Sequence, residues 1–173
     1  MKSILFALLV IGICCSHHNF ESNPNADKPL DDMPENGREF LKGFLEGLGI
    51  NEDIKNLEKC VQNFSEIIDK LKAIVNLLKN ININNVKEVA AKLIEIAKAI
   101  GTLLTPCVKE GSALAKIIML IKNANLAIIA KNILLHLPRF IQAALLTVNG
   151  ITSGNYFNAG LGFGRMLRIA LGI

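Results

Sequence analysis

Apolar residues recur every three or four positions through nearly all of the chain after residue 37. The longest such run lies between residues 51 and 78, where one face of the expected helix carries apolar side chains: Ile54, Leu57, Val61, Phe64, Ile67, Ile68, Leu71, Ile74, Val75 and Leu78. This spacing matches the 3.6-residue turn of an α-helix, and no segment shows the alternation of a half-buried strand. The sequence therefore predicts an all-α fold.

Glycine, proline and asparagine divide this pattern into about six helices of a single bundle. Gly49 and Pro106 end two of the helices, and the Asn-rich stretch 80–85 is expected to form a turn. Ser153 is placed to cap the last helix. The predicted helices occupy, in order, residues 38–48, 51–78, 86–104, 113–137, 138–149 and 156–171. We expect the helical domain to cover residues 37–173.

The segment from Ala113 to Leu137 differs from the other predicted helices because its polar residues are scattered around the helix axis. A helix that is apolar on every side lies at the centre of a bundle or faces lipid. Three lysines in the segment argue against a membrane span, since each is costly at mid-bilayer. We therefore expect a central helix, broken near residues 123–125.

The first and last predicted helices each contain two glycines four residues apart, Gly43 with Gly47 and Gly160 with Gly164. Glycine inside a helix costs about 1 kcal/mol relative to alanine, so these pairs require a reason. Close approach of two helix backbones is one such reason. We expect the first and last helices to pack against each other.

The N-terminus has the three parts of a secretory signal. Lys2 provides the positive charge, Ile4–Cys14 is an apolar run, and Cys14-Cys15-Ser16 places small residues before a cleavage site. The run is too short to span a bilayer. We expect residues 1–16 to be removed as a signal peptide and residues 17–36 to form a disordered polar leader. The mature protein would be secreted or lie in the lumen of the secretory pathway.

Cleavage would leave two cysteines, Cys60 and Cys107, in an oxidising compartment. The midpoint of these two positions falls inside the Asn-rich turn. Residues equidistant from the turn of an antiparallel helical hairpin lie side by side, so the two thiols would be level. The spacing predicts a hairpin stapled by a disulfide, with two free buried thiols as the alternative.

The paired glycines, the Asn-, Lys- and Ile-rich composition and the signal peptide together resemble small secreted helical proteins predicted in ciliates. The likeness covers the two terminal segments and the region around Cys60. It implies a secreted helical protein and carries over no function and no site residue.

Residues that could perform catalysis are few. His136 is the only histidine outside the leader, and its neighbourhood offers neither a nucleophile nor an acid. We expect His136 to be a satisfied buried or interfacial residue, and we expect no metal, no cofactor and no enzymatic activity. Asn63-Phe64-Ser65 is an N-glycosylation sequon, which makes Asn63 a candidate glycosylation site.

All fifteen acidic residues lie at or before Glu110, so residues 111–173 carry positive charge only. The basic residues of this segment are Lys116, Lys122, Lys131, Arg139, Arg165 and Arg168. Such asymmetry favours an anionic surface, a lipid or an acidic partner. Nucleic acid is not expected, because the net charge is only +4 and the chain has no Trp and one Tyr to stack on bases.

Two hypotheses of function follow from the apolar, basic C-terminal half. The first is a secreted, non-enzymatic helical protein that binds a lipid, another apolar ligand or an anionic membrane surface, with a membrane-permeabilising toxin as its sharper form. The second is a structural or self-assembling protein whose apolar surplus forms the interface of a homo-oligomer. The residues expected to face lipid head groups are Lys116, Lys122, Lys131, Arg165 and Arg168.

Overall fold

Eight α-helices and two short 3₁₀-helices make up the described part of the chain, which in this computed structural model comprises residues 33–51, 54–57 and 64–173. The α-helices are α1 (Met33–Leu48), α2 (Ser65–Ala73), α3 (Val75–Lys79), α4 (Val86–Leu104), α5 (Ala113–Lys122), α6 (Leu126–Leu135), α7 (Leu137–Ser153) and α8 (Tyr156–Leu171). The 3₁₀-helices are η2 (Ile54–Asn56) and η4 (Thr105–Cys107). These residues contain no strand, which confirms the predicted all-α class for them.

The described helices outnumber the expected six because two predicted helices are divided. The described residues of the segment 51–78 form η2, α2 and α3, and the break after α2 falls at Ile74, whose φ of −98° and ψ of 1° depart from helical geometry. The segment 113–137 forms α5 and α6. At the start of α6 the side chain of Asn125 accepts hydrogen bonds from the amides of Ala127 (2.9 Å) and Ile128 (3.3 Å). This N-cap explains why the chain breaks where the sequence predicted, near residues 123–125.

Helices α4 and α8 have the bounds expected from the sequence, but the cap of α8 differs from the expected one. Ser153 ends α7 instead, and its hydroxyl donates to the carbonyl oxygen of Asn149 at 2.7 Å. Asn155 caps α8 by accepting from the amide of Asn158 at 3.0 Å. Gly154 separates the two helices with a φ of +72°, a conformation that side chains disfavour.

Helix α1 begins at Met33, four residues before the expected domain boundary. Pro34 lacks an amide hydrogen, which the first turn of a helix does not need, and Glu35 places a negative charge at the positive end of the helix dipole. These two residues favour a helix start, so α1 includes residues that were expected to belong to the polar leader. The rest of the expected leader and the expected signal peptide lie outside the described residues.

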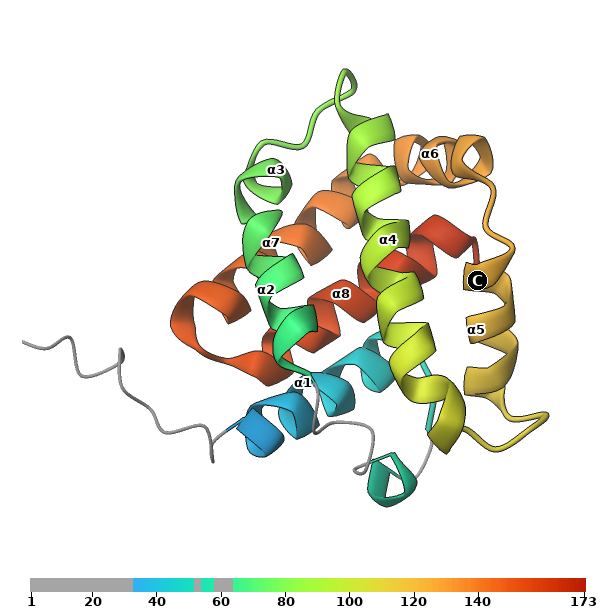
Figure 1. The fold of residues 1–173 in the computed structure, drawn as a ribbon. Helices are drawn as coiled ribbons and strands as arrows, with labels where there is room; N and C mark the ends of the chain where they lie inside the picture. Colours follow the sequence, from blue (N-terminus) through green and yellow to red (C-terminus); the bar gives the residue numbers. More distant parts are fainter. Residues whose placement is uncertain (1–32, 52–53, 58–63) are drawn as a thin grey trace, which may run out of the picture.

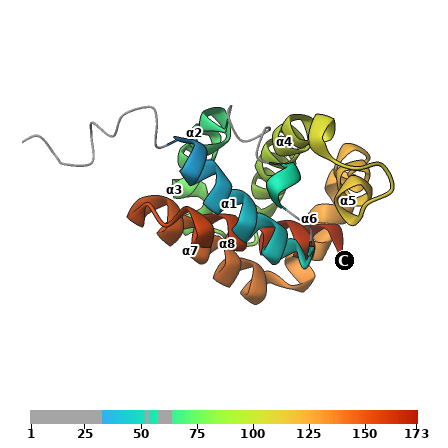
Figure 2. The same cartoon turned by 90° about the horizontal axis from the view of Figure 1, so that it is seen from below.

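Helix α8 occupies the centre of the fold, with α1 on one side and α7 on the other (Figures 1 and 2). Glycines allow both neighbours to approach closely. A Cβ atom on Gly160 would overlap the carbonyl oxygen of Phe40 in α1, and one on Gly164 would lie 3.0 Å from the Cα atom of Gly47. The predicted packing of the first and last helices is therefore confirmed.

The directions of the three helices follow from the residues that face one another. Helix α8 runs parallel to α1 and antiparallel to α7. The facing pairs are Gly43 with Phe157 and Gly47 with Gly164 for α1, and Gly150 with Ala159 and Ala143 with Gly162 for α7. The C-terminal ends of α1 and α8 consequently lie beside the first half of α7.

Four phenylalanines fill the space between the central helices and the start of α2. Phe40, Phe44, Phe64 and Phe163 are at most 2% exposed, and the ring centroid of Phe40 lies 5.0–6.3 Å from those of the other three, with Phe44 and Phe163 6.1 Å apart. Aromatic rings at this separation add to the free energy gained by burying their area. The cluster ties α2 to the α1–α8 pair.

The predicted hairpin is formed by α2 and α3 leading into the turn and α4 returning beside them (Figure 1). Asparagine side chains close the turn: the Asn82 amide donates to the Asn85 side chain at 2.8 Å, and the Asn85 side chain donates to the Asn80 carbonyl at 2.9 Å. Helix α4 also packs against α5 and α6. Seen from below, α2, α4 and α5 lie on one side of the molecule and α7 and α8 on the other (Figure 2).

Candidate functional site

Helices α5 and α6 lie at the edge of the bundle, which corrects the expectation that the segment 113–137 would be central (Figure 1). The physical reason is the size of the side chains. Glycines on α8 let two neighbouring helices approach it closely, whereas α6 contains no glycine and leaves large apolar side chains such as Ile128 and Leu135 exposed.

The outward side of α6 is apolar. Ile128 is 59% exposed and Leu135 is 65% exposed, while Ile129 and Ile133 are buried on the opposite side. Ile128, Lys131 and Leu135 lie three or four positions apart and therefore share one face of the helix. This face offers water large apolar side chains around a single lysine and no carboxylate.

Helix α5 also exposes large apolar side chains beside lysines. Met119 is 63% exposed, whereas Met166 in α8 is fully buried. Beside α5, an open groove of about 220 Å³ is lined by apolar residues such as Val108 and Ile118 together with Met119. We define the α5–α6 surface by the exposed apolar and basic residues Lys116, Met119, Leu120, Lys122, Leu126, Ile128, Lys131, Leu134 and Leu135.

None of the described helices is by itself both long enough and apolar enough to cross a membrane. Helices α5 and α6 reach the required length and composition only when taken together, and a bend of 111° separates them.

Positive charge on the C-terminal half is not balanced by carboxylates. Within the described residues, none of the six cations after residue 111 forms an ion pair with an aspartate or glutamate. The ion pairs of the described part of the chain instead lie on α1, α2 and α4. Positive and negative side chains are thus paired on the N-terminal half of the described fold, whereas the side chains of residues 111–173 carry positive charge only.

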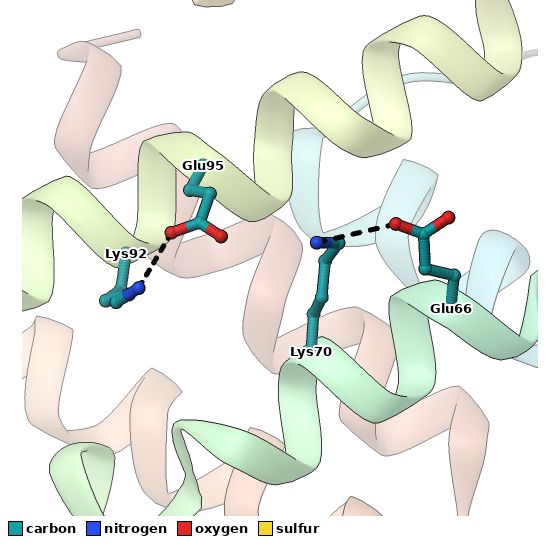
Figure 3. Close-up of polar contacts among 4 residues, drawn as sticks. All are labelled: Glu66, Lys70, Lys92 and Glu95. Carbon is teal, nitrogen blue, oxygen red and sulfur yellow. Dashed lines mark hydrogen bonds and ion pairs between the residues drawn. The ribbon is translucent and has the colours of Figure 1, made fainter.

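The polar face of the α2–α4 hairpin shows the mixed arrangement (Figure 3). Lys92 pairs with Glu95 at 2.9 Å on α4, Lys70 pairs with Glu66 at 3.4 Å on α2, and the Lys70 ammonium points toward the gap between the two helices. The hydrogen bond from Lys92, with its charge and that of Lys70, lowers the pKa of the Glu95 carboxyl, and the same hydrogen bond raises the pKa of Lys92. Exposed pairs of this kind keep a surface neutral and add little stability.

The five basic residues expected to face lipid are not brought together. Lys116, Lys122 and Lys131 belong to the α5–α6 surface, and all three are exposed. Arg165 and Arg168 instead line a separate open groove of about 410 Å³ at the C-terminal ends of α1 and α8.

The separate groove also contains Arg139, in the first turn of α7, and Gln142, one turn further along. Sequence reasoning counted Arg139 among the C-terminal cations but did not select it as a site residue. The i, i+3 spacing of Arg139 and Gln142 is the one signal that could have placed both on the same face of a helix.

No protein family, curated protein or solved structure matches this chain. The likeness to secreted ciliate proteins therefore stays a prediction, and any functional inference must rest on the residues themselves.

The remaining expected sites are placed in part. Cys107 is half-buried in η4 and packs against the core, whereas Cys60 and Asn63 lie outside the described residues. His136 was expected to be buried or interfacial, but it is exposed at the junction of α6 and α7, where its backbone amide donates to the carbonyl of Asn132 at 3.2 Å.

Proposed function

We propose that this protein is secreted, is not an enzyme, and binds anionic membrane surfaces through the α5–α6 surface. The observation that carries the proposal is the exposure of large apolar side chains beside lysines in a segment without carboxylates. Side chains of this kind are costly to leave in water, and a membrane interface accommodates both their apolar and their charged parts.

Two physical terms would contribute to membrane binding. Apolar side chains gain about 25 cal/mol for each Å² that leaves water, which favours the insertion of residues such as Leu135 and Met119 among acyl chains. Each lysine near an anionic surface adds about 1 kcal/mol. The bend between α5 and α6 allows both helices to lie along an interface while their lysines reach the head groups.

The exposed position of the apolar side chains favours surface binding over an enclosed lipid carrier. A carrier would direct Ile128, Leu134 and Leu135 into a cavity, whereas these residues face outward. The grooves at the α5 edge and at the ends of α1 and α8 are open, and their volumes of about 220 and 410 Å³ suit a head group better than a pair of acyl chains.

Neutralising the lysines of the α5–α6 surface is expected to weaken binding to vesicles that contain phosphatidylserine. The variant K116Q/K122Q/K131Q should bind about 100-fold more weakly, because three contributions of about 1 kcal/mol are lost. Raising the salt concentration from about 0.1 M to about 1 M should weaken vesicle binding by the wild-type protein and leave vesicle binding by the variant nearly unchanged. The reason is that the screening length falls from about 10 Å to about 3 Å. Flotation of protein with vesicles measures both effects.

The matched control is K79Q/K87Q/K98Q, which removes three exposed lysines from α3 and α4. Equal loss of binding in the control would mean that net charge alone governs association, contrary to the proposal. A wild-type protein that ignores vesicles and sediments as a concentration-dependent multimer would instead support the alternative, in which the α5–α6 surface joins copies of the chain.

We also propose that Cys107 is bridged to Cys60 and that Asn63 carries a glycan, as secretion would permit. Both follow from the sequence, and the half-buried position of Cys107 against the core is compatible with a disulfide that joins η4 to the segment before α2. Measuring the intact mass of the secreted, non-reduced protein tests the cleavage after Ser16, the disulfide bridge and the glycan together. A mass that corresponds to two free thiols would remove the bridge from the proposal.

The bridge predicts a specific loss of stability on substitution of Cys107. Closing the loop between residues 60 and 107 is expected to contribute about 3–4 kcal/mol. Cys107→Ser should therefore lower the melting temperature by about 10 °C, at about 2–4 °C for each kcal/mol in a domain of this size. A reductant should produce a similar decrease in the wild-type protein and no further decrease in the variant, as measured by circular dichroism.

A further inference from the structure

We propose that the groove at the C-terminal ends of α1 and α8 binds a phosphate group. We call it the arginine groove and define it by Glu46, Arg139, Gln142, Arg165, Arg168 and the backbone around them. The inference does not depend on the α5–α6 surface, because the two sites share no residue.

Three helices build the arginine groove. Arg139 and Gln142 come from the first turns of α7, and Arg165 and Arg168 come from the last turns of α8. Because α7 runs antiparallel to α8, residues distant in sequence meet here, as the contact of Ala143 with Gly162 shows. Glu46 and Gly47, near the end of α1, also line it, and the open groove of about 410 Å³ is large enough for a phosphate group with part of the molecule that carries it.

The charges of the arginine groove are unbalanced. Three arginines line it, and Glu46 is the one acidic residue among its lining residues. Within the described residues no ion pair joins Glu46 to any of the arginines. Arg139 also lies in the first turn of α7, where the helix dipole opposes a positive charge. Like charges gathered in this way are relieved when an anion binds between them.

Arg168 has a structural role that separates it from the other two arginines. Its Nε atom donates to a backbone oxygen of Ile173 at 3.1 Å. Its guanidinium group lies against Gly49, where an added Cβ atom would be only 2.8 Å from Nη1. Helix α1 has no basic residue in its own last turn, so Arg168 supplies the positive charge that its C-terminus favours. Arg139 and Arg165 are thus left to bind a ligand.

Arginine geometry indicates why the ligand would be a phosphate. A planar guanidinium donates two parallel hydrogen bonds to two oxygens of one phosphate, and lysine cannot reproduce this fork. Two such forks approaching from different helices can contact a tetrahedral group on two sides. Gln142 also lines the groove, and its side-chain amide is a further hydrogen-bond donor. The phosphate could belong to a lipid head group or to a soluble molecule, and the two sources require different tests.

The first test titrates inorganic phosphate into isotope-labelled full-length protein and follows the arginine Nε–Hε signals by NMR. We expect saturable shifts for Arg139 and Arg165. The variant R139K/R165K keeps the charge and removes the forks, and it should bind phosphate at least about tenfold more weakly. R139Q/R165Q should lose binding entirely. The control K87Q/K98Q removes two charges from α4 and should bind as the wild-type protein does.

The second test compares vesicles of phosphatidylcholine with and without phosphatidic acid, whose head group is a bare phosphate. A preference for phosphatidic acid that R139K/R165K reduces about tenfold would assign the phosphate to a lipid. Saturable binding of inorganic phosphate without this preference would assign it to a soluble molecule, and would hold even if the α5–α6 surface bound no membrane. The proposal is overturned if phosphate produces no saturable shift, or if R139K/R165K binds phosphate as well as the wild-type protein.

Discussion

Gly160→Ala is expected to destabilise the protein by about 2–3 kcal/mol, although alanine is the better helix former. The added methyl group would overlap the carbonyl oxygen of Phe40 and lie 2.8 Å from the amide nitrogen of Phe44. Both obstacles are backbone atoms of α1, so relief requires the two helices to move apart and to loosen the phenylalanine cluster. This cost exceeds the gain of about 1 kcal/mol in helix propensity. Chemical denaturation followed by circular dichroism measures the difference.

Gly101→Ala provides the matched control. Gly101 is also buried within a helix, but a Cβ atom there would meet only the Ile118 side chain, at an ordinary distance of 3.5 Å. This substitution should stabilise α4 by about 0.5–1 kcal/mol. If Gly160→Ala and Gly101→Ala gave the same stability, α1 and α8 would not be as close as described.

The double variant G43A/G160A sharpens this test. Gly43 and Gly160 face opposite partners across the same helix crossing. Once the first alanine has pushed α1 and α8 apart, the second finds space already made for it. We therefore expect the double variant to lose less free energy of unfolding than the sum of the single losses, with a coupling of about 1 kcal/mol or more.

Replacing Ile128 and Leu135 with asparagine is expected to lower the affinity for phosphatidylserine vesicles by about 30- to 100-fold. The two side chains are among the most exposed apolar groups of the α5–α6 surface. Full burial of one such side chain yields about 1.5–3 kcal/mol, and partial insertion of both should yield about 2–3 kcal/mol in total. Because 1.4 kcal/mol corresponds to a tenfold change in affinity, this loss is readily measured by flotation.

The control for this prediction is I83N/L145N, which makes the same substitutions at exposed positions in the Asn-rich turn and on α7. It should bind vesicles as the wild-type protein does. Both double variants should unfold within a few degrees of the wild-type protein, because they alter side chains that are already in water. Loss of binding in I83N/L145N to the same extent would contradict the assignment of the α5–α6 surface. Loss of a multimer rather than of vesicle binding in I128N/L135N would favour self-assembly.

The helices that sequence predicted best are those with clear signals at both ends. Val86 to Leu104 lies between an asparagine turn and Pro106, and Tyr156 to Leu171 lies between Asn155 and Gly172. The segment 51–78 has no such internal signal. Its apolar spacing continues through Ile74, where the helix nevertheless breaks. Periodicity reports which side of a segment is buried, and it does not report whether the ladder of hydrogen bonds is continuous.

Which helix becomes central could not be inferred from any one helix alone. Hydrophobicity favoured the segment 113–137, but the structure places α8 there because its glycines permit contact on two sides. The sequence contained the glycine pairs and correctly predicted the α1–α8 contact. The sequence did not show that α7 would pack closely against Gly162 of α8. That contact depends on the turn at Gly154 and on the direction of α7.

The candidate sites illustrate the same limit. The α5–α6 surface is continuous in sequence, so its charge and composition were visible as a segment without acids. The arginine groove combines positions 46, 139 and 165, and only the antiparallel packing of α7 on α8 brings the last two together. The cations of such a site can be identified from the sequence, but the fold determines which of them lie close together.

The pairing of α1 with α8 also determines the order in which this protein can fold. Its closest contact joins the first of the described helices to the last, so the phenylalanines of α1 can meet Phe163 only after α8 has been synthesised. In such a chain the apolar face of α1 stays exposed to water while the middle of the domain forms. If the protein is secreted, as we propose, this contact can form only after α8 has also crossed the membrane.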